Sequence, residues 1–326
     1  MVARKVPGAS VAVLRHDTLV HLAGYGVARL GNPAPVTQRT IFQIASLTKP
    51  FTAMAVLLLV EEGKLKLDDP ASRHVARLPA AYSAITVRQL LTHTSGIHPD
   101  VRQANIDEME IDEFWRRLEE RPVSSAPGMS MQYANTGYAV LSFVVEAVSG
   151  MEFGAFLRER IFQPLGMNGS MYRRPRQFDS GHAVGYDLVE GGNVEAPHVF
   201  SGWGNSGIET AAQDLAKFAA ALERRELLSG ASYRQMFAPG TLASGMPAGF
   251  TFGGARAHYG FGWFLTSHGG RTLHTHGGAI AGFSSILNRF PDDGYAIVVL
   301  SNGKQGADRL GQADGIARAV AAVLGL

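Results

Sequence analysis

The sequence predicts an α/β (α+β) protein in which strands from both ends of the chain form one mostly antiparallel sheet. Three observations lead to this prediction: β-prone runs occur near both ends, helical patterns fill the middle, and glycine clusters separate the segments. Strands at the two ends with helices inserted between them favour a sheet flanked by helices, together with a second, mostly helical lobe. A cleft between the two lobes is expected.

Two hairpins are predicted, one near each end of the chain. Residues 9–14 and 19–25 are short β-prone runs separated by a polar turn. Residues 283–290 and 295–300 flank the sequence Pro-Asp-Asp-Gly at 291–294, whose Asp-Gly pair favours hairpin closure.

The middle of the chain reads as helical, with recognisable start and stop residues. Gly63 and Gly150 end two of the patterns, and Pro164 follows a third. Thr210 and Gln213 have the spacing of a capping box, in which the two side chains satisfy each other's backbone donors. The predicted helices cover residues 51–62, 87–92, 112–120, 136–149, 153–162, 210–222 and 310–324.

The two lobes are expected to form one discontinuous unit. Single hydrophobic cores stop growing at about 250–300 residues, and this chain has 326. We assign residues 1–50 and 200–326 to the α/β sheet lobe and residues 51–199 to the helical lobe.

Composition excludes several classes of function. The formal net charge is +2 without a basic stripe, so nucleic acid is not an expected partner. Without cysteine there is no disulfide, thiol nucleophile or Cys-ligated metal. The longest apolar run, residues 51–60, is about half of the roughly 20 residues that span a bilayer, so we expect no membrane span. No leader pattern opens the chain, which predicts a cytoplasmic protein as the sequence stands, or a periplasmic or secreted one if a leader was trimmed.

Ser46 and Lys49 form the first candidate catalytic pair. Pro50 is tolerated only in the first turn of a helix, so the helix begins close to Ser46. Residues three apart on a helix lie about 5–6 Å from each other, within reach of a lysine amine. A lysine held neutral can activate the serine. Taken alone, the same pattern also fits a capping serine and a solvated lysine.

Two further groups of residues add to this pair. Tyr133 and Asn135 lie two apart in an extended segment, so both side chains can face one cleft, although Asn135 alone also fits a helix cap. His276, Gly277 and Gly278 lead toward the second hairpin. Glycines there allow close approach of a substrate, and the amide that follows them can serve as an oxyanion donor.

The three motifs, in this order, resemble those of the class C β-lactamase and penicillin-binding serine hydrolase family, which includes β-lactamase-like esterases, DD-peptidases and D-aminopeptidases. The family motifs are Ser-x-x-Lys, Tyr-x-Asn, and Lys-Thr-Gly or a His-x-Gly substitute. Other segments similar to the family lie at residues 42–45, 90–96, 127–128, 164–167 and 214–216. The resemblance implies the β-lactamase/transpeptidase-like fold.

The resemblance also implies roles for individual residues. Ser46 would be the nucleophile, and Lys49 and Tyr133 the pair that removes and returns its proton. Asn135 would contact a substrate amide or the lysine, and the N–H groups of Ser46 and Ala279 would form the oxyanion hole. The substrate-binding and oxyanion group is therefore predicted as Asn135, His276, Gly277, Gly278 and Ala279.

His276 departs from the lysine of typical β-lactamases, and a neutral imidazole supplies less positive potential for a substrate carboxylate. We therefore expect weak or no β-lactamase activity.

Two other patterns are set aside. Residues 202–207 match G-x-G-x-x-G but no strand of adequate length precedes them, so a glycine-rich cleft loop is preferred to a dinucleotide site. Four histidines lack the carboxylate spacing of a zinc site: His93, His98, His274 and His276. His93 is expected to brace the loop after its helix. No metal and no cofactor are predicted.

The sequence therefore predicts a serine hydrolase that cleaves esters or amides through an acyl-enzyme on Ser46, and we favour a β-lactamase-like carboxylesterase. The alternatives are a D-amino-acid peptidase, DD-peptidase or β-lactamase, and a non-catalytic binder of peptidoglycan fragments. The expected partner is a small ester, amide or D-amino-acid peptide; the sequence carries no signal for the oligomeric state.

Overall fold

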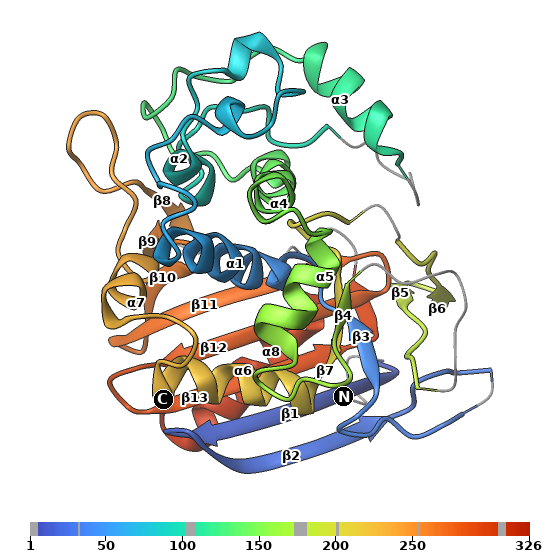
Figure 1. Ribbon diagram of the computed structural model, residues 1–326. Coiled ribbons are helices and arrows are strands. Elements are labelled where there is room, and N and C mark those ends of the chain that lie inside the picture. Colours follow the sequence, from blue (N-terminus) through green and yellow to red (C-terminus); the bar gives the residue numbers. More distant parts are fainter. Residues whose placement is uncertain are drawn as a thin grey trace.

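An eight-stranded antiparallel sheet crosses the molecule, in the order β2-β1-β13-β12-β11-β10-β9-β8 (Figure 1). The computed structural model describes residues 6–31, 33–101, 109–172, 181–199, 202–252, 255–305 and 311–326. In sheet order, the strands are β2 Thr18–Gly26, β1 Gly8–Arg15, β13 Tyr295–Ser301, β12 Phe283–Phe290, β11 Arg271–Ile280, β10 Phe264–His268, β9 Ala255–Tyr259 and β8 Gly249–Phe252.

Both predicted hairpins are present. β1 pairs with β2, and β12 pairs with β13 across a turn that ends at Gly294, whose φ of 69° is accessible to glycine. β1 also pairs with β13, so that Val11 lies opposite Val299. Strands from the two end regions of the chain therefore lie side by side in one sheet, as the sequence predicts.

Alternation along the strands gives the sheet two buried faces. Val11 and Val13 of β1 belong to a core cluster with Ala313 and Ala317 of α8 (Gly311–Leu324), which covers one face. Ala12 and Leu14 belong to the larger cluster on the other face, which includes residues of α6 (Ala212–Arg224) and α1 (Lys49–Glu61).

The helices form near the predicted positions. They are α2 Val87–Leu91, α3 Ile111–Glu119, α4 Asn135–Ser149, α5 Phe153–Leu157 and α7 Gly230–Met236, in addition to α1, α6 and α8. Short 3-10 turns occur at Ala71–Arg73 and Ala80–Tyr82. α2, α3 and α4 lie together above α1 in Figure 1. The helix predicted over residues 153–162 changes to a π-helical turn at Arg158–Phe162, just before Pro164, which has no N–H to donate.

The predicted capping box at Thr210 is wrong. Thr210 lies in strand β7 (Ile208–Ala211), and its hydroxyl is 2.6 Å from Ser170 Oγ. α6 begins after Ala211, without a side-chain cap. Pairing of β7 with β3 therefore takes priority over the local capping pattern.

Two small sheets flank the main one. β7 lies between β3 (Ile41–Gln43) and β4 (Met171–Tyr172), and β5 (Tyr186–Val189) lies between β14 (Gly303–Gln305) and β6 (Gly192–Glu195). β4 and β5 thus pair with strands from the C-terminal part of the chain. The division into lobes at 51–199 stays a prediction.

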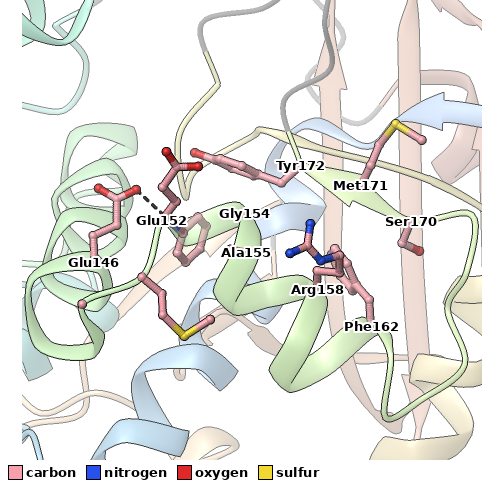
Figure 2. A pocket seen from close by; sticks show the side chains of 12 residues that line it. Glu146, Glu152, Gly154, Ala155, Arg158, Phe162, Ser170, Met171 and Tyr172 are labelled. Atoms are coloured by element: carbon pink, nitrogen blue, oxygen red, sulfur yellow. Dashed lines mark hydrogen bonds between the residues drawn. The ribbon is translucent and has the colours of Figure 1, made fainter.

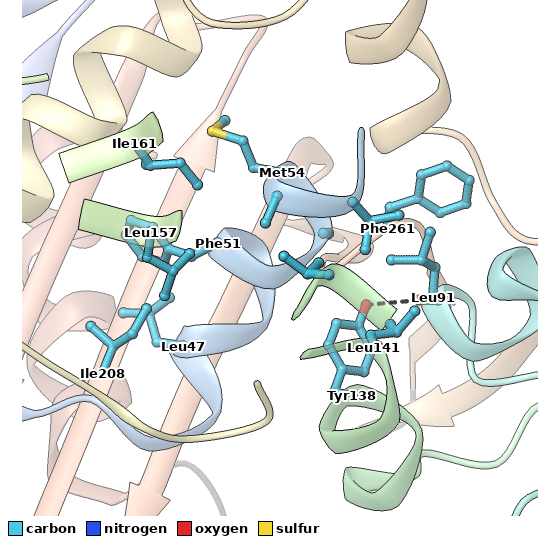
Figure 3. Packing of buried hydrophobic residues seen from close by; sticks show 14 of the residues in the cluster. Leu47, Phe51, Met54, Leu91, Tyr138, Leu141, Leu157, Ile161, Ile208 and Phe261 are labelled. Carbon is cyan, nitrogen blue, oxygen red and sulfur yellow. Dashed lines mark hydrogen bonds between the residues drawn. The ribbon is translucent and has the colours of Figure 1, made fainter. Parts of the chain in front are cut away.

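α1 is the buried helix at the base of the site. Its side chains from Lys49 to Leu59 are buried, and Phe51 stacks on Phe218 with ring centroids 4.0 Å apart. Figure 3 shows Phe51 and Met54 packed among Leu157 and Ile161. Taken singly, none of the described helices is long and apolar enough to cross a membrane; Asn135–Ser149 and Phe153–Phe162 satisfy that criterion only jointly, across an 80° bend.

Candidate active site

Ser46 lies in a 3-10 turn, Ala45–Thr48, that leads directly into α1. Ala45 has a φ of 47°, a left-handed conformation that L-residues seldom adopt and that is often associated with functional sites. Ser46 is half-buried, whereas its neighbours Ala45 and Leu47 are buried. The turn thus presents the serine side chain at the start of a rigid helix, where the sequence places it.

Lys49 is fully buried at 0% exposure, and its amine contacts three oxygen atoms. Nζ lies 3.0 Å from Ser46 Oγ, 2.9 Å from Asn135 Oδ1 and 3.0 Å from the backbone oxygen of Asn205. Nζ also lies 4.8 Å from the ring centroid of Tyr133. A buried amine held on several sides has little freedom to move away from the serine hydroxyl.

Asn135 is the first residue of α4 and links two elements. While its Oδ1 accepts from Lys49, its Nδ2 donates to Asp100 Oδ2 at 2.9 Å. Tyr133, two residues earlier, is half-buried and stacks on Phe264 with centroids 5.8 Å apart. Tyr133 and Asn135, which lie two positions apart, therefore both face the amine of Lys49.

β11 brings the glycine motif against the serine turn. A Cβ atom built on Gly278 would lie 2.1 Å from the oxygen of Ile44 and 2.8 Å from the nitrogen of Ser46. Only glycine permits this approach, since real Cβ contacts are not that short. Gly277 and Ala279, on either side, are half-buried.

His276 is buried at 0% exposure, and both of its ring nitrogens have protein partners. Nδ1 lies 2.8 Å from the carbonyl oxygen of Gly277, which only accepts, so Nδ1 carries the proton. Nε2 then accepts from the Tyr259 hydroxyl at 3.0 Å. Burial, followed by the charge of Lys49, lowers the pKa of His276 to about 3. This imidazole is neutral near pH 7.

The loop at residues 203–207 is a component that sequence reasoning identified only as a glycine-rich cleft loop. Its Gly204 oxygen accepts from Thr52 Oγ1 at 2.6 Å, and its Gly204 N–H donates to Ser142 Oγ at 3.2 Å. These contacts tie the loop to α1 and α4 and bring the Asn205 oxygen to Lys49. The role of Asn205 was missed because a backbone carbonyl leaves no residue-type signal, and Tyr259 was missed because its partner lies 17 positions away.

The structure therefore brings Ser46, Lys49, Tyr133, Asn135 and the glycine motif of β11 together. A pocket elsewhere, between α4, α5 and β4, is lined by Glu146, Arg158 and Tyr172, among others (Figure 2). None of the predicted site residues lines that pocket. Among the described residues, no group of three or more His, Asp or Glu side chains is arranged to hold a metal ion.

A buried amine lies against a serine at the start of a helix, beside the internal strands β11 and β12 of an antiparallel sheet. This arrangement is that of a serine hydrolase, and comparison with known proteins agrees with it. The sequence profile described as Beta-lactamase matches residues 1–321, and the chain belongs to the β-lactamase family of serine hydrolases.

Particular relatives are similar over most of the chain. Penicillin-binding protein 4* of Bacillus subtilis (strain 168) is 31% identical in an alignment 321 residues long that covers 90% of this chain and 68% of that protein. The octameric penicillin-binding protein homologue from Pyrococcus abyssi has a TM-score of 0.84 at 30% identity, covering 100% of this chain and 75% of the other. D-amino acid amidase from Ochrobactrum anthropi SV3, complexed with L-phenylalanine, has a TM-score of 0.84 at 27% identity, covering 99% and 95%. The predicted fold class is confirmed.

Proposed function

We propose that this protein cleaves esters or amides through an acyl-enzyme on Ser46. The observation that carries the proposal is the 3.0 Å contact between Lys49 Nζ and Ser46 Oγ. A hydroxyl next to a buried amine is the arrangement of an activated nucleophile. The same contact speaks against a non-catalytic binder, which has no use for an amine held at the serine.

The other contacts of the amine support a role for Lys49 as the base. Asn135 Oδ1 and the Asn205 oxygen can only accept hydrogen bonds. A neutral amine has two N–H bonds and one lone pair. When the amine is neutral and both N–H bonds are donated to those oxygens, its lone pair is available to Ser46 Oγ, 3.0 Å away, and the Ser46 hydroxyl then donates to it. Lys49 accepts the Oγ proton while Oγ bonds to the substrate carbonyl carbon.

The remaining steps follow from that geometry. Attack by Ser46 places negative charge on the substrate oxygen, and we assign the N–H groups of Ser46 and Ala279 as its donors, since Gly278 brings β11 against the serine turn. Collapse of the intermediate expels the leaving group, which takes the proton from Lys49 with the help of Tyr133. Water then attacks the acyl carbonyl, gives up a proton by the same route, and releases the acid and free Ser46.

Within this class we favour a carboxylesterase for uncharged esters. His276 donates its only proton to Gly277, accepts from Tyr259, and has none left for a substrate carboxylate. We propose that His276 supports β11 rather than binding an anionic substrate, whereas DD-peptidase and β-lactamase substrates carry a carboxylate. Substrate contacts of Asn135, Gly277 and Gly278 stay predictions.

A second candidate is hydrolysis of a D-amino acid amide. The observation that favours it is the likeness to the D-amino acid amidase, which extends over 99% of this chain. The amide of an amino acid also lacks a carboxylate, so it is compatible with a neutral His276. The two candidates therefore differ in leaving group and acyl part and not in the catalytic residues.

The test compares p-nitrophenyl butyrate, D-alanine p-nitroanilide and nitrocefin as substrates of the wild type and Ser46→Ala. Ser130→Ala, at an exposed serine, is the matched control. We expect turnover of the ester that is lost in Ser46→Ala and kept in Ser130→Ala, and slower turnover of the mono-p-nitrophenyl ester of glutaric acid, which adds a carboxylate. Turnover of the anilide or nitrocefin instead would reassign the substrate. No turnover and no fluorophosphonate adduct on Ser46 by mass spectrometry would favour the binder.

A further inference from the structure

His93 lies two residues after the end of α2 and faces the candidate site. Its side chain is 1% exposed, and its ring centroid is 4.4 Å from those of both Tyr133 and Tyr259. Sequence analysis expects it to brace a loop. The structure identifies the braced segment as the one that carries Tyr133.

His93 accepts two hydrogen bonds from the residues on either side of Tyr133. The His93 backbone oxygen accepts from the N–H of Gln132 at 2.8 Å, and its Nδ1 accepts from the N–H of Ala134 at 3.1 Å. One residue thus holds the backbone immediately before and immediately after the tyrosine. The phenol ring is then fixed against the imidazole on one side and Phe264 on another.

The conformation and charge state of His93 both fit this contact. Its φ of 57° is left-handed, a strained conformation that persists where the surroundings hold it in place. Nδ1 can accept a hydrogen bond only if it carries no proton. Burial, the charge of Lys49 and the nearby His276 keep the pKa of His93 well below its ordinary value, so the acceptor is retained near pH 7.

We infer that His93 is a positioning residue that holds Tyr133 over the amine of Lys49 through the paired hydrogen bonds to Gln132 and Ala134. The inference rests on the proposed function, in which Tyr133 takes part in proton transfer. His93 acts through Tyr133 and does not itself touch the reacting atoms. Loss of the Nδ1 acceptor should therefore lower kcat more than it raises KM.

Two substitutions of His93 separate the contribution of the hydrogen bond at Nδ1 from the contribution of the ring's bulk. His93→Asn keeps an acceptor at the position of Nδ1 and tolerates positive φ. His93→Phe keeps an aromatic ring but has no acceptor. His98→Phe, on the same loop and without a ring contact to Tyr133 among the interactions described, is the matched control. Circular dichroism and Tm establish that each variant is folded.

The readouts are kcat and KM for p-nitrophenyl butyrate and hydrogen–deuterium exchange of the peptide that spans Gln132 to Asn135. We expect His93→Phe to lose roughly 10- to 100-fold in kcat with little change in KM, the effect of a small misplacement, and to exchange faster in that peptide. His93→Asn should keep kcat within about threefold of the wild type and remain protected. His98→Phe should match the wild type.

Each contrary result has a distinct meaning. Unchanged hydrogen exchange in His93→Phe would refute the claim that the hydrogen bonds to His93 hold the backbone on both sides of Tyr133. Faster exchange with unchanged kcat would refute the positioning role. In either case, Ser46-dependent turnover in the wild type leaves the proposed function intact. A wild type without turnover or Ser46 labelling would overturn the proposed function, and the positioning role with it. If His93→Phe does not fold, a loss of kcat in His93→Asn well beyond about threefold, with His98→Phe unchanged, decides against the rescue on which the inference depends.

Discussion

Acidification should destabilise this protein through His276, and the effect can be worked out from its surroundings. The pKa of His276 is lowered from 6.5 to about 3 by burial, with a further contribution from the charge of Lys49. As the pH falls, the unfolded chain therefore takes up the proton first. The contribution to stability is fully present above the unfolded pKa and is lost progressively between 6.5 and about 3.

The size of the effect follows from the same two values. At about pH 5, the pH lies roughly 1.5 below the unfolded pKa, and each pH unit corresponds to about 1.4 kcal/mol. The folded protein remains unprotonated at His276. Between about pH 7.5 and 5, His276 should therefore remove roughly 2 kcal/mol from the free energy of unfolding. Carboxyl groups with ordinary pKa values near 4 contribute mainly below this window.

The assay is urea unfolding of the wild type and His276→Gln at both pH values. Glutamine offers an amide NH₂ group as donor and a carbonyl oxygen as acceptor, so it can replace the contacts to Gly277 and Tyr259 without titrating. Contributions of the other histidines cancel in the difference between the two proteins. The wild type should lose roughly 2 kcal/mol more than the variant on acidification. Equal losses of unfolding free energy in the wild type and His276→Gln would mean that His276 takes up its proton in the folded state. That result would refute the argument that the His276 imidazole is neutral in the folded protein.

Other predictions test the site and the core. Lys49→Met, which keeps the bulk of the side chain without the amine, should lower kcat by roughly 10²- to 10⁴-fold in a steady-state ester assay, and activity within twofold would contradict the base assignment. Gly278→Ala should impair turnover because its Cβ would lie 2.1 Å from the Ile44 oxygen, whereas Gly31→Ala, in open space, should match the wild type in the same assay. Phe51→Ala should cost about 3–5 kcal/mol of unfolding free energy in urea titrations, and a loss below about 1 kcal/mol would mean that this core relaxes around the cavity.

Local patterns predicted most of the fold. The hairpin turns, the glycine stops of α1 and α4, and Pro50 at the start of α1 are signals within a few residues of the elements they define. The prediction at Thr210 failed because a strand partner far away in sequence competed with a local cap.

The candidate site likewise contains some contacts that local sequence patterns predict and others that they do not. Spacing predicted that Ser46 and Lys49 meet, and that Tyr133 and Asn135 face one cleft. The Asn205 carbonyl, the Tyr259 hydroxyl on His276 and the hydrogen bonds to His93 on either side of Tyr133 could not be predicted, because each depends on a backbone atom or on a partner brought together by the tertiary fold.

The contact between the serine turn and the sheet also bears on how the chain reaches its native state. Ser285 Oγ donates to the Ile44 oxygen at 2.7 Å across 241 positions of sequence, and β1 lies between β2 and β13. Such non-local pairing makes folding slow, since long loops must close before the contacts that stabilise them form. On the ribosome, the apolar segment of α1 emerges long before β12 and β13 exist to complete its surroundings. Soluble yield should therefore depend on synthesis rate and temperature more strongly than the stability of the finished protein does.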